Sequence, residues 1–150
     1  MYKPWETPNG PGRLQQNKAG PSGTPTSVQY LEYTYDPVGN VATRKDYNNA
    51  GQVETFTYDA LDRLRTAVTN GQGQDNYALK TYTYHPNGNI DTREEAQYAY
   101  NDAAHKHAVT HVGGAPKYEY DENGNMTTRT AGANTYTQTY DQENRLTAVT

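Results

Sequence analysis

The sequence predicts an all-β fold made of consecutive antiparallel β-hairpins that join into one continuous sheet. Three observations predict it. A segment that ends in tyrosine recurs along the chain, turn-forming residues follow that tyrosine at fixed offsets, and an aliphatic residue or methionine stands six places after it. Signals for helices are nearly absent. Self-similar units of this kind are typical of repeat architectures, in which each unit contacts its neighbours.

The composition sets limits on how such a sheet is stabilised. Val, Ile, Leu and Phe make up only 16 of the 150 residues, whereas the chain has 15 tyrosines and a net charge of −4. A buried tyrosine removes about 150–250 Å² from water if its hydroxyl finds a partner, so we expect tyrosine to take the place of the usual aliphatic core. The absence of cysteine excludes disulfides and thiolate metal sites. No basic surface indicates a nucleic-acid partner, and no apolar run is long enough to span a membrane.

The turn of each unit follows from the residues after its tyrosine. The tyrosines are Tyr35, Tyr58, Tyr84, Tyr120 and Tyr140, and the next residues are Asp36, Asp59, His85, Asp121 and Asp141. Aspartate favours the first position of a type I turn, where its carboxylate accepts a backbone N–H. Four places after the tyrosines stand Gly39, Asp62, Gly88, Gly124 and Asn144, which are predicted to occupy the left-handed position of a three-residue hairpin loop.

The hairpins follow one another along the chain. The first covers residues 32–46, where Pro37 presets φ in the turn, and its loop predicts that Tyr35 pairs with Val41 and Tyr33 with Thr43. The second runs from Phe56 through the "LDRL" turn, and the third covers residues 81–95. A weaker copy at residues 98–112 is interpreted as irregular strand. Two more units begin near residues 118 and 136.

Strand alternation places an aromatic pair and an aliphatic residue or methionine of each unit on one face of the sheet. This face is the predicted repeat core, and threonines such as Thr34, Thr57 and Thr83 point the other way. The predicted core residues are Tyr33, Tyr35, Val41, Phe56, Tyr58, Leu64, Tyr82, Tyr84, Ile90, Tyr118, Tyr120, Met126, Tyr140 and Leu146.

Two regions are expected. Residues 1–27 are rich in Pro and Gly and are predicted to be a linker or a partial repeat, because "PGRLQQ" is similar to "LDRLRT". Residues 28–150 are predicted to be a repeat sheet of about five to six hairpins. The chain is interpreted as a segment of a longer array. The alternative is a stand-alone array that self-associates through open sheet edges.

The sequence gives only weak evidence for a metal-binding or catalytic site. His105, His107 and His111 would share one face of a strand, which makes them weak candidates for metal ligands. No carboxylate completes the set, so no metal or other cofactor is predicted. The "DENGN" segment lacks the glycine and glutamate positions of a calcium loop. The turn aspartates are too alike to serve as an acid–base pair, and no nucleophile is apparent, so we predict that the chain is not an enzyme.

Five arginines recur near the second strand of the units. We expect them to stack on tyrosine rings or to pair with turn aspartates. They are Arg44, Arg63, Arg93, Arg129 and Arg145.

The segments "YTYDPVGN", "FTYDALDRL", "YEYDENGNM" and "QTYDQENRLTAV" resemble the tyrosine-aspartate (YD) repeats of the Rhs family, whose relatives occur in insecticidal toxin complexes and in teneurins. "HAVT" before a YD unit also resembles Rhs proteins. The resemblance covers about residues 27–150. It implies a curved β-sheet that forms part of a hollow shell, and in bacterial members that shell encloses a toxic polypeptide.

The resemblance implies a non-catalytic, structural function. The chain would build the wall of a shell, with the rest of that shell and an enclosed effector polypeptide as partners. It would be secreted or delivered by a bacterial secretion system. The alternative is an extracellular adhesive module that binds glycan or protein on its aromatic face.

Overall fold

The computed structural model describes residues 12–74 and 76–150. In these residues all regular structure is β, and every strand pairing is antiparallel between neighbours in the sequence. The predicted fold class is therefore confirmed. Among the described residues no helix is long and apolar enough to cross a membrane. The chain divides into two compact units, residues 1–81 and 82–150.

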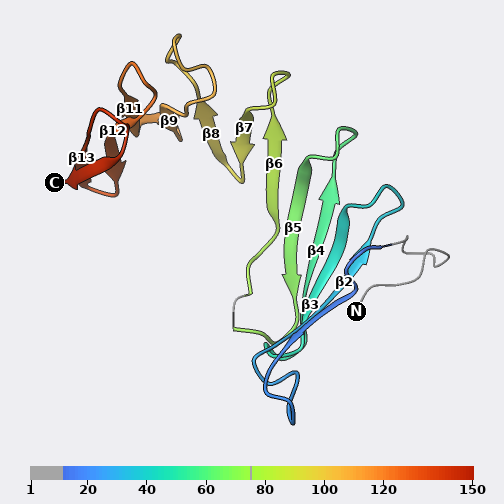
Figure 1. Ribbon diagram of the computed structural model, residues 1–150. Helices are drawn as coiled ribbons and strands as arrows, with labels where there is room; N and C mark the ends of the chain where they lie inside the picture. Colours follow the sequence, from blue (N-terminus) through green and yellow to red (C-terminus); the bar gives the residue numbers. More distant parts are fainter. Residues whose placement is uncertain (1–11, 75) are drawn as a thin grey trace. The chain divides into compact units, whose positions relative to one another are not determined.

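The first unit is a sheet in which each strand pairs with the next (Figure 1). Its strands are β1 (Gln16–Ala19), β2 (Gln29–Tyr35), β3 (Val41–Asp46), β4 (Gln52–Tyr58), β5 (Leu64–Asn70) and the first residues of β6 (Lys80–Tyr84). Strand β1 lies inside the range expected to be a linker or a partial repeat.

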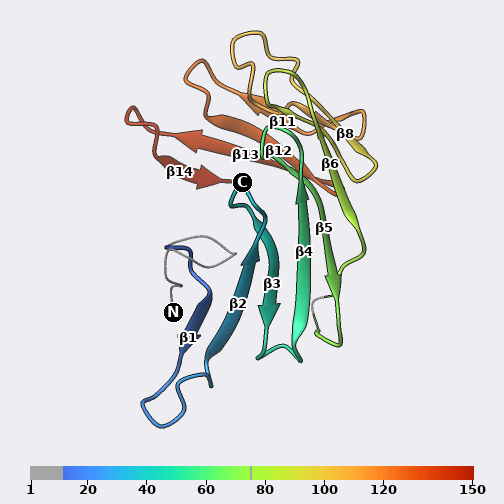
Figure 2. The same cartoon turned by 90° about the vertical axis from the view of Figure 1, so that its right-hand side faces the viewer.

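The second unit contains two hydrogen-bonded ladders, whose strands are seen from another side in Figure 2. The first ladder comprises the end of β6, β7 (Ile90–Arg93), β8 (Ala96–Ala99), β9 (His111–Val112) and β10 (Ala115–Pro116). The second comprises β11 (Tyr118–Tyr120), β12 (Met126–Ala131), β13 (Asn134–Tyr140) and β14 (Leu146–Val149).

The strand register contains a β-bulge beside the turn in five hairpins. Tyr35 pairs with Val41, but Thr34 then pairs with Thr43, so Ala42 is left without a partner. The predicted pairing of Tyr33 with Thr43 is wrong, because the extra residue moves Arg44 opposite Tyr33. The same shift occurs between Thr57/Tyr58, Thr83/Tyr84, Glu119/Tyr120 and Thr139/Tyr140.

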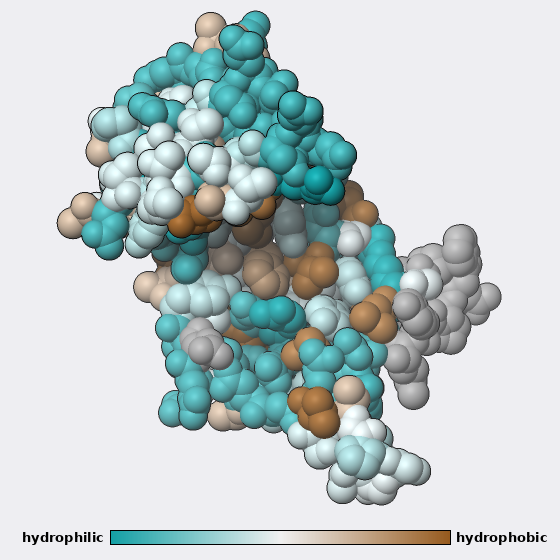
Figure 3. Space-filling view, turned by 60° about the vertical axis from the view of Figure 1, so that its left-hand side comes forward, coloured by the Kyte–Doolittle hydropathy of each residue, from teal (hydrophilic) through white to brown (hydrophobic). Residues whose placement is uncertain are grey.

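Most side chains in the sheets are only half-buried. Leu31 and Ala67 are the only hydrophobic residues classed as buried in the described part of the chain, and no side chain there is completely enclosed. Figure 3 shows hydrophobic residues in small patches within a largely hydrophilic surface. The predicted core residues are half-buried except Leu146, which is 51% exposed. The strands contact mainly their sequence neighbours.

Candidate functional site

A contact between a hairpin and the segment before it recurs at five tyrosines of the structure. We call it the tyrosine joint: the tyrosine that precedes a turn, with the backbone carbonyl to which its hydroxyl donates. The donor–acceptor pairs are Tyr35 to Leu14 (2.6 Å), Tyr58 to Val41 (2.9 Å), Tyr100 to Ile90 (3.0 Å), Tyr120 to Val109 (2.8 Å) and Tyr140 to Met126 (3.0 Å). Each phenol ring is half-buried, so the joint combines apolar contact with a directed hydrogen bond.

The sequence distinguishes this position from the aromatic position two residues earlier. The earlier position holds tyrosine in most units, but Phe56 in one and Gln138 in another. The position before the turn is always tyrosine. A phenylalanine would fill the same space without donating, so the hydroxyl accounts for the difference. Burial raises the pKa of Tyr58, Tyr100 and Tyr120, which keeps these hydroxyls protonated as donors.

The turn aspartates hold the loops that carry the joint. In the 120–126 unit, Asp121 Oδ1 accepts the backbone N–H groups of Asn123 (3.0 Å) and Asn125 (2.9 Å). Its Oδ2 accepts the side-chain amide of Asn125 (2.9 Å). The Asn125 side chain and these backbone donors lower the pKa of Asp121 against the opposing effect of burial. Asp36, Asp59 and Asp141 accept equivalent bonds and their pKa values are also lowered.

The left-handed positions carry positive φ. The values are 111° at Gly39, 59° at Asp62, 91° at Gly88, 83° at Gly124 and 59° at Asn144. Asp62 and Asn144 have a second role that sequence reasoning missed, because each accepts a hydrogen bond from the turn of the preceding hairpin.

That hydrogen bond comes from an asparagine five places after a tyrosine. Asn40 Nδ2 donates to Asp62 Oδ1 (2.8 Å), and Asn125 Nδ2 donates to Asn144 Oδ1 (2.8 Å). Asn89 Nδ2 likewise reaches the next turn, at the carbonyl of Lys106 (2.8 Å). The recurring "GN" pair at residues 39–40, 88–89 and 124–125 was the sequence signal for this role.

The five recurring arginines belong to two groups. Arg63 and Arg145 lie in turns and pair with the turn aspartates Asp59 (2.7 Å) and Asp141 (2.8 Å). The other three follow the bulge and lie opposite the first tyrosine of their unit. These pairs are Arg44 with Tyr33, Arg93 with Tyr82 and Arg129 with Tyr118. Arg44 also forms an ion pair with Glu54.

The histidines do not share a strand face. Residues 101–110 form a loop between β8 and β9, so the strand geometry expected for these side chains is wrong. His105 Nδ1 lies 2.8 Å from Asp102 Oδ2, and this bond raises the pKa of the histidine. His107 Nδ1 lies 2.6 Å from Asn89 Oδ1, whereas His111 contacts its neighbour Thr110. In the described ranges no three His, Cys, Asp or Glu residues are grouped to hold a metal ion.

Threonine pairs occupy the face opposite the tyrosines. Thr34 and Thr43 lie 2.6 Å apart at their hydroxyl oxygens, and Thr83 and Thr92 lie 2.7 Å apart. The bulge produces this pairing. It places the residue eight positions after the tyrosine opposite the residue that immediately precedes the tyrosine. The opposite face is therefore held by hydroxyl hydrogen bonds between the strands of a hairpin.

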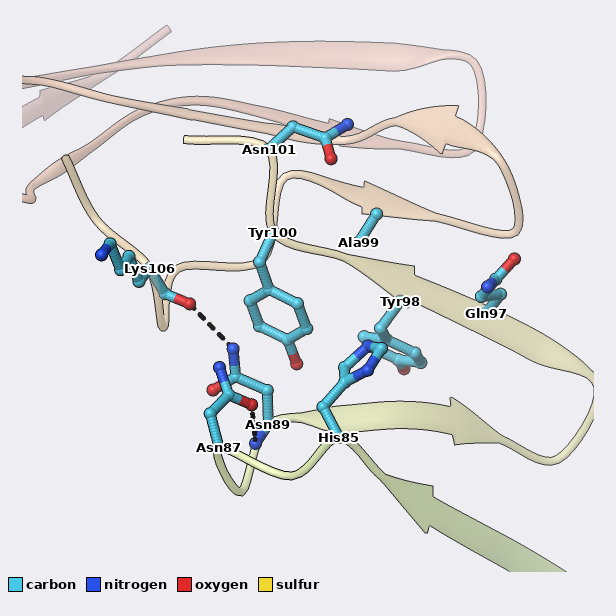
Figure 4. A pocket seen from close by; sticks show the side chains of 9 residues that line it. All are labelled: His85, Asn87, Asn89, Gln97, Tyr98, Ala99, Tyr100, Asn101 and Lys106. Carbon is cyan, nitrogen blue, oxygen red and sulfur yellow. Dashed lines mark hydrogen bonds between the residues drawn. The ribbon is translucent and has the colours of Figure 1, made fainter. Parts of the chain in front are cut away.

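Two open cavities lie beside tyrosine joints. One of about 400 Å³ is lined by His85, Asn87, Asn89, Gln97, Tyr98, Ala99, Tyr100, Asn101 and Lys106. Figure 4 shows the Tyr100 ring beside Asn89, whose amide reaches the Lys106 carbonyl. The other, of about 350 Å³, lies on the tyrosine face of the first unit between Tyr33, Phe56 and Arg44.

Known proteins match this arrangement in part of the chain. Residues 35–75 match the family model described as RHS Repeat. This segment is similar to the RHS repeat. This range contains the joint of Tyr58 with Val41, and the resemblance to YD repeats of the Rhs type is confirmed.

A solved structure has a fold similar to that of this chain. It is a crystal structure of TcdB2-TccC3-Cdc42, with a TM-score of 0.56 and 20% sequence identity over 81% of this chain. The chain spans only 7% of the length of that protein. No curated protein matches the chain.

Proposed function

We propose that the chain is a non-catalytic structural segment of an Rhs-like polymorphic toxin or toxin-complex protein. In this proposal it builds the β-sheet wall of a shell that encloses a toxic effector. The observation that supports it best is the tyrosine joint, which connects five hairpins to the segment before them. A side chain used in the same way at five junctions serves to extend a surface, because catalysis needs groups whose environments differ.

The partners and location follow from the same proposal. The partners are the remaining wall of the shell and the enclosed polypeptide, and the complete protein is secreted or delivered by a bacterial secretion system. The RHS repeat and the shared fold of the toxin-complex structure support this assignment.

We also propose that residues 28–150 are the repeat segment and that the preceding residues include the remnant of a repeat. The hydroxyl of Tyr35 donates to Leu14 as later tyrosines donate to Val41 or Met126. Gly12 has a φ of 69° two residues before Leu14, and Asp62 has a φ of 59° two residues before Leu64. These two similarities support a partial unit at residues 12–16.

Protease protection tests the enclosing role. The complete protein that contains this segment would be treated with a broad-specificity protease, before and after the shell is opened by mild urea. We expect the enclosed polypeptide to resist cleavage until the wall opens. Equal cleavage in both conditions would contradict the proposal. The control is a variant in which a long linker holds the enclosed polypeptide outside the shell, where the protease can cleave it.

A second candidate is a binding module that uses the tyrosine face. The cavity between Tyr33, Phe56 and Arg44 favours it, because half-buried aromatic rings beside a cation are suited to stacking on a sugar or a peptide side chain. Glycan-array binding that is lost in Phe56→Ala and retained in Val38→Ala would support this candidate. Val38 is an exposed residue at a turn tip.

A further inference from the structure

The two ladders of the second unit meet at a break in the strand pairing. Among the described strands, β10 does not pair with β11. At the break the carbonyl of Thr110 accepts the backbone N–H groups of Lys117 (2.8 Å) and Tyr118 (3.2 Å). We call this place the seam, with residues 101–110 on one side and residues 117–125 on the other. Because paired strands do not cross the seam, side-chain contacts across it matter for the attachment of the two ladders.

One side chain, His105, forms hydrogen bonds on both sides of the seam. Its Nδ1 lies 2.8 Å from Asp102 Oδ2, within its own loop. The ring also bonds to the backbone of Glu122, in the turn between β11 and β12, and a Cβ atom at Gly124 would lie 3.4 Å from its Cδ2. The bond to Glu122 favours the charged ring, so its acceptor is the carbonyl oxygen. Since Nδ1 faces Asp102, this second bond falls to Nε2.

The two bonds together require the imidazolium form of the ring. A carboxylate and a backbone carbonyl accept hydrogen bonds and donate none, so both ring nitrogens of His105 must carry a hydrogen. The imidazolium has a hydrogen on each nitrogen, whereas the neutral ring has only one. Deprotonation therefore leaves either Asp102 or the Glu122 carbonyl opposite a nitrogen lone pair, and His105 then holds one side of the seam instead of two.

The groups that face His105 favour its charged form. The hydrogen bond to Asp102 is the main reason that the pKa of His105 is raised above 6.5, and the charge of Asp121 acts in the same direction from across the seam. The ring of Tyr120 lies beside the histidine, with the ring centres 6.5 Å apart. The bond to His105 also lowers the pKa of Asp102, so this carboxylate is ionised throughout the range in which the histidine titrates.

We propose that the seam is a pH-sensitive contact between the two ladders, closed while the His105 imidazolium bonds to both Asp102 and Glu122 and loosened once the ring is neutral. Protonation of histidine is a known means of changing an interface near neutral pH. Because the pKa of His105 is raised in the folded state, its stabilisation is complete below the ordinary value of 6.5 and is lost as the pH rises through the folded value.

A tyrosine joint across the same seam limits the change. The Tyr120 hydroxyl donates to the Val109 carbonyl (2.8 Å), and burial raises its pKa above the ordinary value of 10.0. This bond therefore persists while His105 titrates, and the seam loosens without separating the ladders. The inference goes beyond the proposed function and requires no enclosed polypeptide, so its failure would leave the protease-protection test unaffected.

The test follows the seam by NMR in the full chain between about pH 5.5 and about pH 8.5, the range in which histidine titrates. All four histidine rings are titrated. Protection of the Lys117 and Tyr118 amides is measured as their exchange rate relative to that of an unstructured peptide at the same pH. His105→Arg provides a permanent cation and His105→Gln a neutral ring substitute. His85→Gln, in the turn between β6 and β7, controls for the loss of a histidine elsewhere.

We expect protection of Lys117 and Tyr118 in the native chain to fall about threefold or more between the two pH limits, with its midpoint at the measured pKa of His105. His105→Arg should abolish the fall. An arginine is suited to this place, since the Arg13 guanidinium likewise lies against a turn glycine, Gly39. Protection in His105→Gln should be low at both limits, and His85→Gln should behave as the native chain does.

Protection that is independent of pH in the native chain would overturn the inference. A midpoint that follows the titration of another histidine would also overturn it, because that histidine would then be the group responsible. A pH dependence that survives in His105→Gln would have the same meaning. Should neither substitution at His105 fold, the midpoint in the native chain alone decides between these outcomes.

Discussion

The tyrosine before each turn contributes both an apolar ring and a hydrogen-bond donor. Its ring covers the sheet, as a phenylalanine would, and its hydroxyl donates to a carbonyl of the preceding hairpin. A chain with few aliphatic residues gains from this combination. Each joint adds a hydrogen bond where a phenylalanine would leave the carbonyl without a donor.

Tyr120→Phe tests the contribution of one hydroxyl. We expect the free energy of unfolding to fall by about 1 kcal/mol, because the Val109 carbonyl loses its donor at 2.8 Å. Urea unfolding followed by circular dichroism measures the change. The matched control is Tyr118→Phe in the same strand, which should leave the midpoint nearly unchanged. A larger loss in the control than in Tyr120→Phe would contradict this role.

Asp121 predicts a dependence of stability on pH. Its pKa is lowered in the folded state below the ordinary value of 3.8, chiefly by the Asn125 side chain. The stabilisation is therefore complete above the unfolded pKa and is lost as the pH falls through the lower folded value. NMR titration of the carboxyl should give a pKa below 3.8, and acid unfolding should begin at a higher pH in Asn125→Ala. An Asp121 pKa unaffected by that change would contradict the stated cause.

Much of the turn chemistry was accessible from the sequence. Glycine, aspartate and asparagine at one offset implied positive φ, and these positions have it. The acceptor role of Asp62 and Asn144 was not accessible, since it depends on which turn lies beside them in space. The sequence did not show that the five arginines form two groups, for the same reason.

At the scale of the hairpin, the bulge after each turn determines which side chains meet. A one-residue shift moves every residue beyond the bulge to the other face of the sheet. The predicted pairing of Val41 with Tyr35, before the bulge, was therefore correct, whereas the predicted pairing of Thr43 with Tyr33, beyond it, was wrong. The turn residues alone determine the conformation of the loop, whereas the bulge depends on pairing along the whole strand. The Arg44 side chain reaches the tyrosine face only because of it.

The asparagine link between turns predicts a local effect on the following hairpin. Asn125→Ala removes the amide bond to Asn144 and the one to Asp121, and we expect a loss of about 1 kcal/mol because these bonds are partly exposed to water. Amide exchange in β13 and β14 should accelerate. Asn123→Ala is the control, since Asn123 contributes its backbone N–H to the turn. Unchanged exchange near residue 144 in Asn125→Ala would exclude the link.

At the scale of the whole molecule, strands contact mainly their neighbours, so stability should be close to a sum of local terms. Tyr58→Phe and Tyr140→Phe lie in different compact units. We expect their losses in free energy of unfolding to add within about 0.5 kcal/mol in the double variant. Tyr58→Phe should accelerate amide exchange in β3 and β4 and leave β13 and β14 unchanged. A coupling well above that margin would show that the units are not energetically independent.

The all-β hairpin architecture was predictable because its signal repeats, and five copies of one spacing leave little ambiguity about the fold. The 98–112 segment was harder, because its loop is longer than the others and removes the fixed spacing. His105 and His107 were placed on a strand with His111, but they lie in the loop that precedes β9.

The most direct test of the account replaces five tyrosines at once. The first variant changes the joint donors Tyr35, Tyr58, Tyr100, Tyr120 and Tyr140 to phenylalanine. The second changes five other tyrosines, Tyr33, Tyr82, Tyr98, Tyr118 and Tyr136, in the same way. Urea unfolding should show that the first variant loses about 5 kcal/mol, or does not fold, while the second keeps a transition near that of the native chain. Equal stability of the two variants would contradict the claim that tyrosine hydroxyls join one hairpin to the next.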